Sequence, residues 1–175
     1  MNEVLKVMKE RRSIRAFKPE MIAQEDLDAI IEAGLWAPSG RGEQGVVSLV
    51  ITNPELIREL GDDNQAIMGM EPSEKPFYGA PVVVVVLADK SAVTSMYDAP
   101  LVMENMMLAA ASLGIGSIWI HRAKEEFEMD KYKQLLKDNG LDGEYEGVGH
   151  CLLGYAEGDA PEPKPRKDGR VVYIK

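Results

Sequence analysis

The chain has 175 residues, of which 45% are hydrophobic, and it carries a formal net charge of −9. A chain of this length is expected to form one domain, residues 1–175, with a hydrophobic core of its own. The acidic balance argues against general binding to nucleic acid or to an anionic membrane surface, because both require an excess of Lys and Arg.

The cysteine content and the first residues bear on the compartment. The single cysteine, Cys151, has no partner for an internal disulfide, and residues 1–10 lack the basic start and apolar stretch of a signal peptide. The longest apolar run, residues 80–88, is far shorter than the roughly 20 residues of a membrane helix. With only two histidines, a zinc site is improbable as well. We therefore expect a cytoplasmic protein with neither a membrane span nor a metal site.

The amino-terminal half is expected to alternate helices and strands, because apolar residues recur at helical spacing in some segments and β-branched residues cluster in others. Helix boundaries follow from acidic first turns, from Asn53-Pro54 at a helix start and from Gly or Pro at helix ends. The predicted elements are a helix before Arg11, a core-facing helix from Glu25 to near Ala37, a strand over residues 46–52, a helix over 54–60 closed by Gly61, and a loop over 62–79 with room for one helical turn.

The carboxy-terminal half contains the two most informative elements. Residues 82–87 are six consecutive apolar residues and predict a strand covered on both faces. Residues 100–113 predict a helix with apolar side chains at nearly every angle, whereas a surface helix of a monomer should present a polar face. Its second cover comes either from another subunit, through a large apolar interface, or from its own chain. The other predicted elements are a strand over 115–120, a helix over 124–139, a strand over 148–155, a proline-rich segment over 160–165 and a final strand around 171–174.

Two basic segments stand out in this acidic chain, and we call residues 11–15 the N-terminal basic segment and residues 164–167 the C-terminal basic arm. The first predicts either a phosphate-bearing ligand, because Arg side chains suit phosphate oxygens, or a basic turn that satisfies the last carbonyls of the preceding helix. The second lies among prolines and predicts either an arm that reaches a ligand or a solubilising tail. The residues concerned are Arg11, Arg12, Ser13 and Arg15 in the first segment and Lys164, Arg166 and Lys167 in the second.

Other chemical patterns are weak or absent. Residues 40–45 match G-x-G-x-x-G, but a helix precedes them and a strand follows, which is the reverse of the order in a dinucleotide-binding fold. No G-x-S-x-G elbow or Walker A loop is present. His150 and Cys151 are neighbours on a predicted strand and therefore point to opposite faces, so they do not form a catalytic pair locally.

A set of motifs along nearly the whole chain resembles the nitroreductase family of flavin mononucleotide (FMN) enzymes. The motifs are residues 11–15, 36–40, Gln44, 77–81 before the valine strand, 105–116 and 164–167. The resemblance implies an α+β fold with a central, mostly antiparallel sheet flanked by helices. It also implies an intertwined homodimer with two FMN molecules at the subunit interface.

The same resemblance implies roles for individual residues. Arg15 would lie near N1 and O2 of the flavin ring, where negative charge accumulates on reduction, and Asn64 near the pyrimidine edge. Residues around the phosphate and ribityl chain would be Arg11, Arg12, Ser13, Lys164 and Arg166; the partner subunit would supply Pro38, Ser39 and Gly40, in the same turn as Gln44; and the segment along the ring edge near N5 would be Ile118, Trp119, Ile120, His121 and Arg122.

By this resemblance the chain is an oxidoreductase in which NAD(P)H gives a hydride to the flavin and leaves, after which a nitroaromatic, quinone or similar acceptor takes the electrons. No side chain needs to act as a catalytic nucleophile, since the flavin carries the chemistry. The alternative from another class is a flavin-binding redox sensor or flavin carrier without turnover. The chain departs from many members at residues 42–46, where a proline and an aromatic ring are missing, so the acceptor is not defined.

Overall fold

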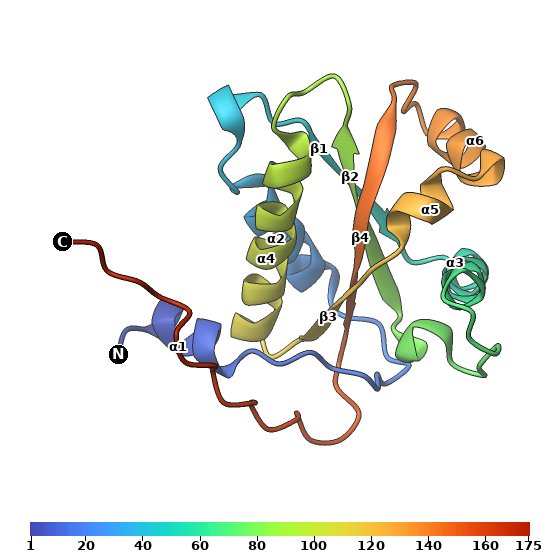
Figure 1. Cartoon of the computed structure of the whole chain (residues 1–175). Helices are drawn as coiled ribbons and strands as arrows, with labels where there is room; N and C mark the ends of the chain where they lie inside the picture. The colour runs from blue at the N-terminus through green and yellow to red at the C-terminus, as the bar shows by residue number, and fades with distance from the viewer.

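A four-stranded sheet in the order β1-β2-β4-β3 organises the chain, and every neighbouring pair of strands is antiparallel (Figure 1). The computed structural model describes all 175 residues. The strands are β1 (Val46–Ile51), β2 (Val82–Asp89), β3 (Gly116–Ile120) and β4 (Tyr145–Gly154). The predicted α+β class with an antiparallel central sheet is confirmed.

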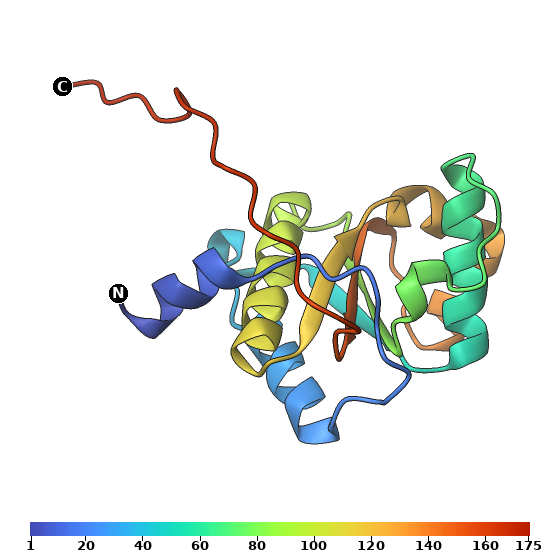
Figure 2. The ribbon, with the colours of Figure 1, turned by 90° about the horizontal axis from the view of Figure 1, so that it is seen from below.

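Helices cover both faces of the sheet. Figures 1 and 2 show α2 and α4 on one face and α3, α5 and α6 on the other. No helix has the length and apolar character needed to cross a membrane. The helices are α1 (Glu3–Glu10), α2 (Gln24–Leu35), α3 (Pro54–Ile67), α4 (Ser95–Ser112), α5 (Ala123–Phe127) and α6 (Asp130–Asp138), with short 3₁₀ turns η1 (Gly40–Gly42) and η2 (Pro76–Gly79).

Strand β2 is the centre of the core, as its sequence predicts. All six residues from 82 to 87 are fully buried. Because successive side chains of a strand point to opposite faces, Val84 and Val86 pack into the cluster under α2 and α4. Val83 and Val85 pack into the cluster under α3, α5 and α6. The sheet is therefore buried on both faces, and the functional surfaces lie at its edges and ends.

Helix α3 extends to Ile67, so the prediction that it closes on Gly61 is wrong. Gly61 lies inside the helix and is buried, and a Cβ atom placed on it would come within 2.6 Å of Pro76 Cβ. The glycine therefore allows α3 to pack closely against η2 rather than ending the helix. Of the predicted loop over 62–79, residues 62–67 belong to α3 and residues 76–79 form the short turn η2.

Helix α4 begins at Ser95, earlier than the predicted start at Pro100. Proline favours the first turn of a helix, which is why the sequence pointed to that position. The extra turn is anchored from outside the helix, because Ser95 Oγ donates to Asp89 O at 2.7 Å and Thr94 Oγ1 donates to Asp98 Oδ2 at 2.8 Å.

Two further predictions are wrong. The segment over 124–139, predicted as a single helix, forms two helices, because the backbone of Met129 is extended. Phe127 before this break and Tyr132 after it stack their rings, with centroids 5.3 Å apart. Residues 171–174 form no strand and are exposed, since a strand requires a neighbour and this segment has none within the chain.

We predict that Gly61→Ala lowers the free energy of unfolding by about 1–3 kcal/mol, because the new methyl group overlaps Pro76. In an open helix interior the same change raises stability by about 1 kcal/mol, so the sign is diagnostic. Urea denaturation measures the difference. Gly34→Ala in α2 is the matched control with a smaller loss, because its Cβ would meet the flexible Met106 side chain. A gain in stability for Gly61→Ala would contradict the close packing of α3 on η2.

Candidate functional site

The N-terminal basic segment runs along the outer edge of β3. Ser13 forms a parallel bridge with Ser117, and the Ile14 amide donates to Ser117 O at 3.0 Å. Further along, the Phe17 amide donates to Tyr78 O at 3.2 Å. The segment therefore connects the start of β3 with η2.

The base of the carboxy-terminal tail lies beside this segment. The Glu157 amide donates to Ala16 O and the Lys18 amide donates to Tyr155 O, each at 2.9 Å. The basic part of the tail is different, because Lys164 and Arg166 are exposed and the tail extends away from the sheet and helices in Figure 2. The structure thus brings the two segments together at the base of the tail and not at its basic residues.

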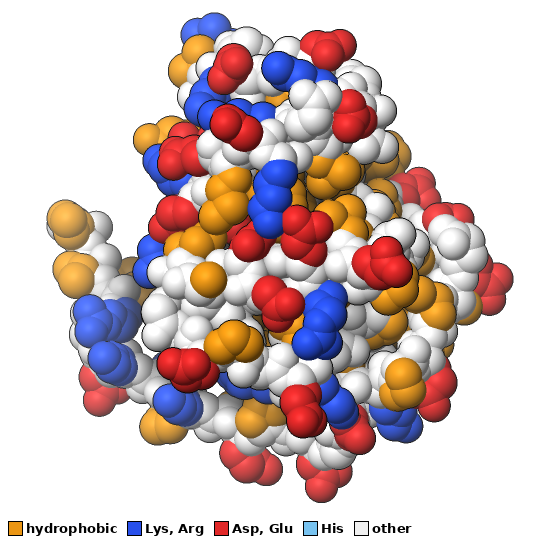
Figure 3. All heavy atoms as spheres, turned by 90° about the vertical axis from the view of Figure 1, so that its right-hand side faces the viewer, with side chains coloured by type: hydrophobic (Ala, Val, Ile, Leu, Met, Phe, Trp, Pro, Cys, Tyr) orange, Lys and Arg blue, Asp and Glu red, His pale blue; other side chains and the backbone are white.

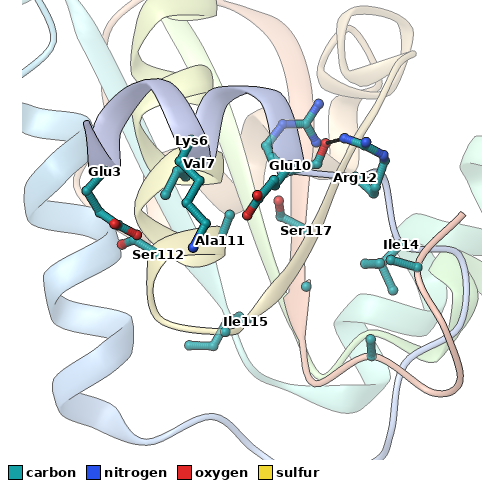
Figure 4. Close-up of a pocket in the computed structure, with 15 residues that line it drawn as sticks. Glu3, Lys6, Val7, Glu10, Arg12, Ile14, Ala111, Ser112, Ile115 and Ser117 are labelled. Carbon is teal, nitrogen blue, oxygen red and sulfur yellow. Dashed lines mark hydrogen bonds between the residues drawn. The ribbon is translucent and has the colours of Figure 1, made fainter. Parts of the chain in front are cut away.

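A cavity of about 380 Å³ lies between α1, the carboxyl end of α4 and the start of β3 (Figure 4). We call it the α1–α4 cavity; Arg11, Arg12 and Ser117 are among its lining residues. The Nη1 atom of Arg11 is buried there and has no hydrogen-bond partner in the chain. A buried guanidinium nitrogen without a partner is costly, so this atom calls for an anionic or carbonyl oxygen from elsewhere.

The other side chains of this cavity have mixed roles. Arg12 Nη1 donates to Lys9 O at 2.7 Å and to Arg11 O at 2.8 Å, so Arg12 satisfies carbonyls at the end of α1. Figure 4 shows Glu3 and Glu10 extending from α1 toward the cavity. Of the two interpretations of the basic segment, carbonyl capping fits Arg12 and ligand binding fits Arg11.

Arg15 lies on the exposed side of the basic segment, where its Nη1 atom is 3.4 Å from Ser13 O. A second cavity, of about 280 Å³, adjoins it and is lined by residues 13–16 and by the base of the tail. Arg15 therefore stands between the α1–α4 cavity and η2, with its charge free to meet a ligand.

A pocket of about 470 Å³ lies at the far end of β3, between α3, η2 and residues 119–121. We call it the α3–β3 pocket. Asn64 lines it, is only 2% exposed, and donates from Nδ2 to His121 O at 2.8 Å. Phe77 lines its wall with an aromatic side chain, whereas the Trp119 ring packs on the other face of the sheet, against the core under α2 and α4. The structure thus brings Asn64 together with the predicted segment at the end of β3.

The remaining members of that segment differ in accessibility. Ile118 is buried in the core, whereas Ile120 and His121 line the α3–β3 pocket. Arg122 has a left-handed backbone with φ of 82° and forms an ion pair with Glu125 at 2.8 Å. The pKa of the Glu125 carboxyl is lowered by a hydrogen bond from the Glu125 backbone amide and by the Arg122 side chain. Arg122 is therefore engaged at the start of α5.

The turn with Pro38, Ser39, Gly40 and Gln44 lies at the opposite end of α4. The Gly40 amide is 3.3 Å from both carboxylate oxygens of Asp98, and Ser39 Oγ accepts from the Gln44 amide at 3.1 Å. Asp98 is in the first turn of α4, whereas the α1–α4 cavity begins at Ala111, a distance of about 20 Å along the helix. One protomer therefore keeps the turn and the basic segment apart.

Sequence reasoning missed a buried contact between a glutamate and a histidine behind the α3–β3 pocket. His150 Nε2 lies 2.7 Å from Glu126 Oε2, and both side chains are fully buried. Burial raises the pKa of Glu126, while His150 and Asn64 act in the opposite direction. The signal available in the sequence was the position of Glu126, which lies on the same helix face as the apolar residues Ala123 and Phe127.

Comparison with known proteins identifies a family. The model of the nitroreductase family matches residues 8–155. A relative from Archaeoglobus fulgidus, provisionally named NADH dehydrogenase/NAD(P)H nitroreductase, is 32% identical over 141 residues, which cover 78% of this chain and 77% of the relative. Solved structures of nitroreductases with bound FMN from Bacteroides fragilis and Desulfitobacterium hafniense match over 100% of both chains. Their TM-scores are 0.87 and 0.86, and their sequence identities are 29% and 32%.

We predict that the Cys151 thiol is inert in the folded protein. It is fully buried, and burial raises the pKa of the thiol to about 12, so almost no thiolate exists at pH 8.5. Iodoacetamide should therefore modify Cys151 slowly in the native state and rapidly in guanidinium chloride, as mass spectrometry would record. Equal rates in the two states would contradict this. Because the folded-state pKa is the higher one, this group stabilises the fold fully below pH 9, and that contribution falls as the pH rises toward 12.

Proposed function

The chain belongs to the nitroreductase family, and on this premise we propose that it is a homodimeric FMN enzyme that oxidises NAD(P)H and reduces electron-poor acceptors such as nitroaromatics or quinones. The relatives that support this proposal are named as NAD(P)H nitroreductases or carry bound FMN. The observation in this chain that carries it is the buried, unpartnered Nη1 atom of Arg11, on the segment that runs along β3 toward the α3–β3 pocket.

The residues present fit the phosphate end of FMN. Arg11 offers a buried donor without a partner, and the Ser13 hydroxyl lies on the same segment. A charge-assisted hydrogen bond from a guanidinium to a phosphate oxygen is among the stronger polar contacts in proteins. Lys164 and Arg166 would add to this end of the site once the exposed tail folds onto a protomer.

The other end of the site fits an aromatic ring. From Ser117 to His121 the strand rises about 13 Å, which separates the α1–α4 cavity from the α3–β3 pocket. The pocket combines the aromatic residues Phe77 and Tyr78 with the Asn64 carboxamide, a mixture typical of small-molecule sites. Arg15 lies between the two ends, and a fixed cation beside a ring that gains electrons raises its electron affinity.

When bound, FMN supplies the capacity to accept a hydride and to pass electrons on, so the protein needs no nucleophile of its own. The side chains bind, orient and shield. The arginines hold the phosphate end, Asn64 fixes one edge of the ring, and the apolar wall limits access of water. An open face is then left for the nicotinamide and the acceptor in turn.

Exposed apolar side chains on α1 and α4 support a homodimer. Helix α1 buries none of its residues, and even its apolar side chains Val4, Leu5 and Met8 are 48–61% exposed. On α4, Tyr97 is 78% exposed and Leu101 is 43% exposed. We call these side chains the α1–α4 apolar face. Such a face suits a subunit interface, and a partner there would bring its own turn at Pro38–Gln44 to the basic segment.

The opposite side of the molecule has a different character. Figure 3 views the side with α3, α5 and α6, where acidic and basic side chains are interspersed. Ion pairs such as Lys131 with Glu59 at 2.7 Å and Lys124 with Glu146 at 2.9 Å contribute to this surface. A mixed, charged surface of this kind is typical of a face in contact with water. The contrast favours the α1–α4 apolar face as the interface.

Steady-state turnover tests the function. Purified protein loaded with FMN should oxidise NADH or NADPH with menadione or a nitrofuran as acceptor. Arg11→Ala should weaken FMN binding by about 10- to 150-fold, the range of a hydrogen bond to a charged group, whereas Arg58→Ala on exposed α3 should bind as wild type does. Failure to bind FMN would contradict the proposal. Binding without turnover would favour a redox sensor or flavin carrier.

We predict that Leu101→Glu separates the dimer, because it places a charge on the α4 side of the α1–α4 apolar face. Light scattering should show a dimer for the wild type and a monomer for the variant, and the monomer should lose FMN. Met21→Glu, at an apolar residue ahead of α2 that is 50% exposed against 43% for Leu101, is the control and should stay dimeric. A Leu101→Glu dimer that retains FMN would contradict this interface.

A further inference from the structure

Three polar side chains meet behind the α3–β3 pocket, and each comes from a different element. Asn64 of α3, Glu126 of α5 and His150 of β4 are 2%, 0% and 0% exposed. Apolar residues of the core cluster such as Leu60 and Val85 belong to the same layer, and the Asp63 carboxylate lies near enough to Glu126 to act on its charge. Asn64 has a role in the proposed binding of FMN, whereas Glu126 and His150 have none so far.

Fold stability alone does not account for this pair. Taking a carboxyl group and an imidazole out of water costs about as much as their contact returns, and apolar residues of similar volume often stabilise a core as well or better. The cost is higher here because His150 Nδ1 and Glu126 Oε1 have no hydrogen-bond partner in the chain. A pair kept at such a cost is a candidate for a role in the neighbouring site.

His150 supports one wall of the pocket. Its ring lies against Phe77, with centroids 5.0 Å apart and planes tilted by 42°. Phe77 and Tyr78 both have left-handed backbones, with φ of 51° and 57°, which is strained for residues other than glycine. Strain of this kind persists only where the surroundings hold it, and it concentrates at functional sites. The His150 ring is one of the surfaces that hold Phe77 in this turn.

Glu126 faces the second wall. The Asn64 amide is close enough to Glu126 to favour its carboxylate form, and its Nδ2 atom donates to His121 O. The bond to His121 O fixes the amide in one orientation, because only its nitrogen end can donate. The Asn64 Oδ1 atom is thereby left to accept a hydrogen bond from a ligand in the pocket.

We propose that the buried Glu126–His150 pair is a positioning pair, which holds the Asn64 carboxamide and the Phe77 ring in the one arrangement that meets a flavin ring in the α3–β3 pocket. The proposal rests on the proposed FMN function. Neither residue of the pair touches the ligand. Both act through the side chains in front of them, Glu126 through Asn64 and His150 through Phe77.

Two kinds of variant separate positioning from stability. Glu126→Gln keeps the shape of the side chain and replaces its carboxyl group with an amide. The double variant Glu126→Met/His150→Phe replaces the pair with apolar side chains of similar volume, which should keep or raise the unfolding midpoint. Leu136→Ala is the control, because it opens a void in the same core cluster without touching the pair.

The measurements are FMN titration of flavin-depleted protein, visible circular dichroism of the bound flavin, and thermal unfolding. We expect Glu126→Gln and the double variant to bind FMN about tenfold more weakly, as for loss of one well-placed hydrogen bond, with an altered flavin dichroism. Leu136→Ala should unfold at lower temperature and bind FMN with the wild-type Kd.

The outcomes distinguish this inference from the function on which it rests. Wild-type affinity and dichroism in both pair variants would overturn the positioning role and leave the proposed function intact. An equal loss of FMN affinity in Leu136→Ala would also overturn it, since general destabilisation would then explain the effect. A wild-type protein that binds no FMN would overturn both.

Discussion

The length of α4 governs the organisation of the candidate site. One end of this helix holds the turn at Gly40 through Asp98, and the other end lies beside Arg11. Because the rise per residue of a helix is fixed, no change of side-chain conformation brings the turn and the basic segment of one protomer into contact. In the proposed twofold dimer built on the α1–α4 apolar face, the turn of one protomer would lie against the basic segment of the other. The dimer is thus part of the proposed site.

The sheet supplies the rigid reference for everything else. Strand β2 is buried on both faces, β4 pairs with it, and β3 forms the edge along which residues 13–18 run. Cavities and pocket follow that edge in order, from Arg11 to Asn64. Sites built beside strands and packed helices hold their side chains more precisely than sites on free loops. The Glu126–His150 pair extends this support to the far end of the edge.

Features that depend on local pattern were predictable from the sequence, and features that depend on distant contacts were not. The buried character of β2 follows from its composition alone. Gly61 was misread because its role, close approach to Pro76, involves a residue beyond the helix. The segment at residues 171–174 has strand composition and no partner in its own chain. A sequence rule that treats each segment separately has no means of recognising either case.

The candidate site shows the same division. The concentration of arginines at residues 11–15 is visible in the sequence, and so are both of its interpretations, which the structure divides between Arg12 and Arg11. The burial of Glu126 was not predictable, because it requires β4 and α3 to pack around α5. Polar residues in a core are recognised only when their partners are known.

The central claim, one FMN held by two protomers, is tested most directly by mixing two defective chains. Arg11→Ala removes the donor of one protomer, and Gly40→Ala disrupts the turn of the other, because its Cβ would lie 2.3 Å from Thr94 Oγ1. Neither homodimer should hold FMN at micromolar flavin. A heterodimer has one site with both defects and one site with neither, so the account predicts one FMN per heterodimer, measured by flavin absorbance. Heterodimers without FMN would contradict a shared site, since each protomer would then depend on its own damaged residues.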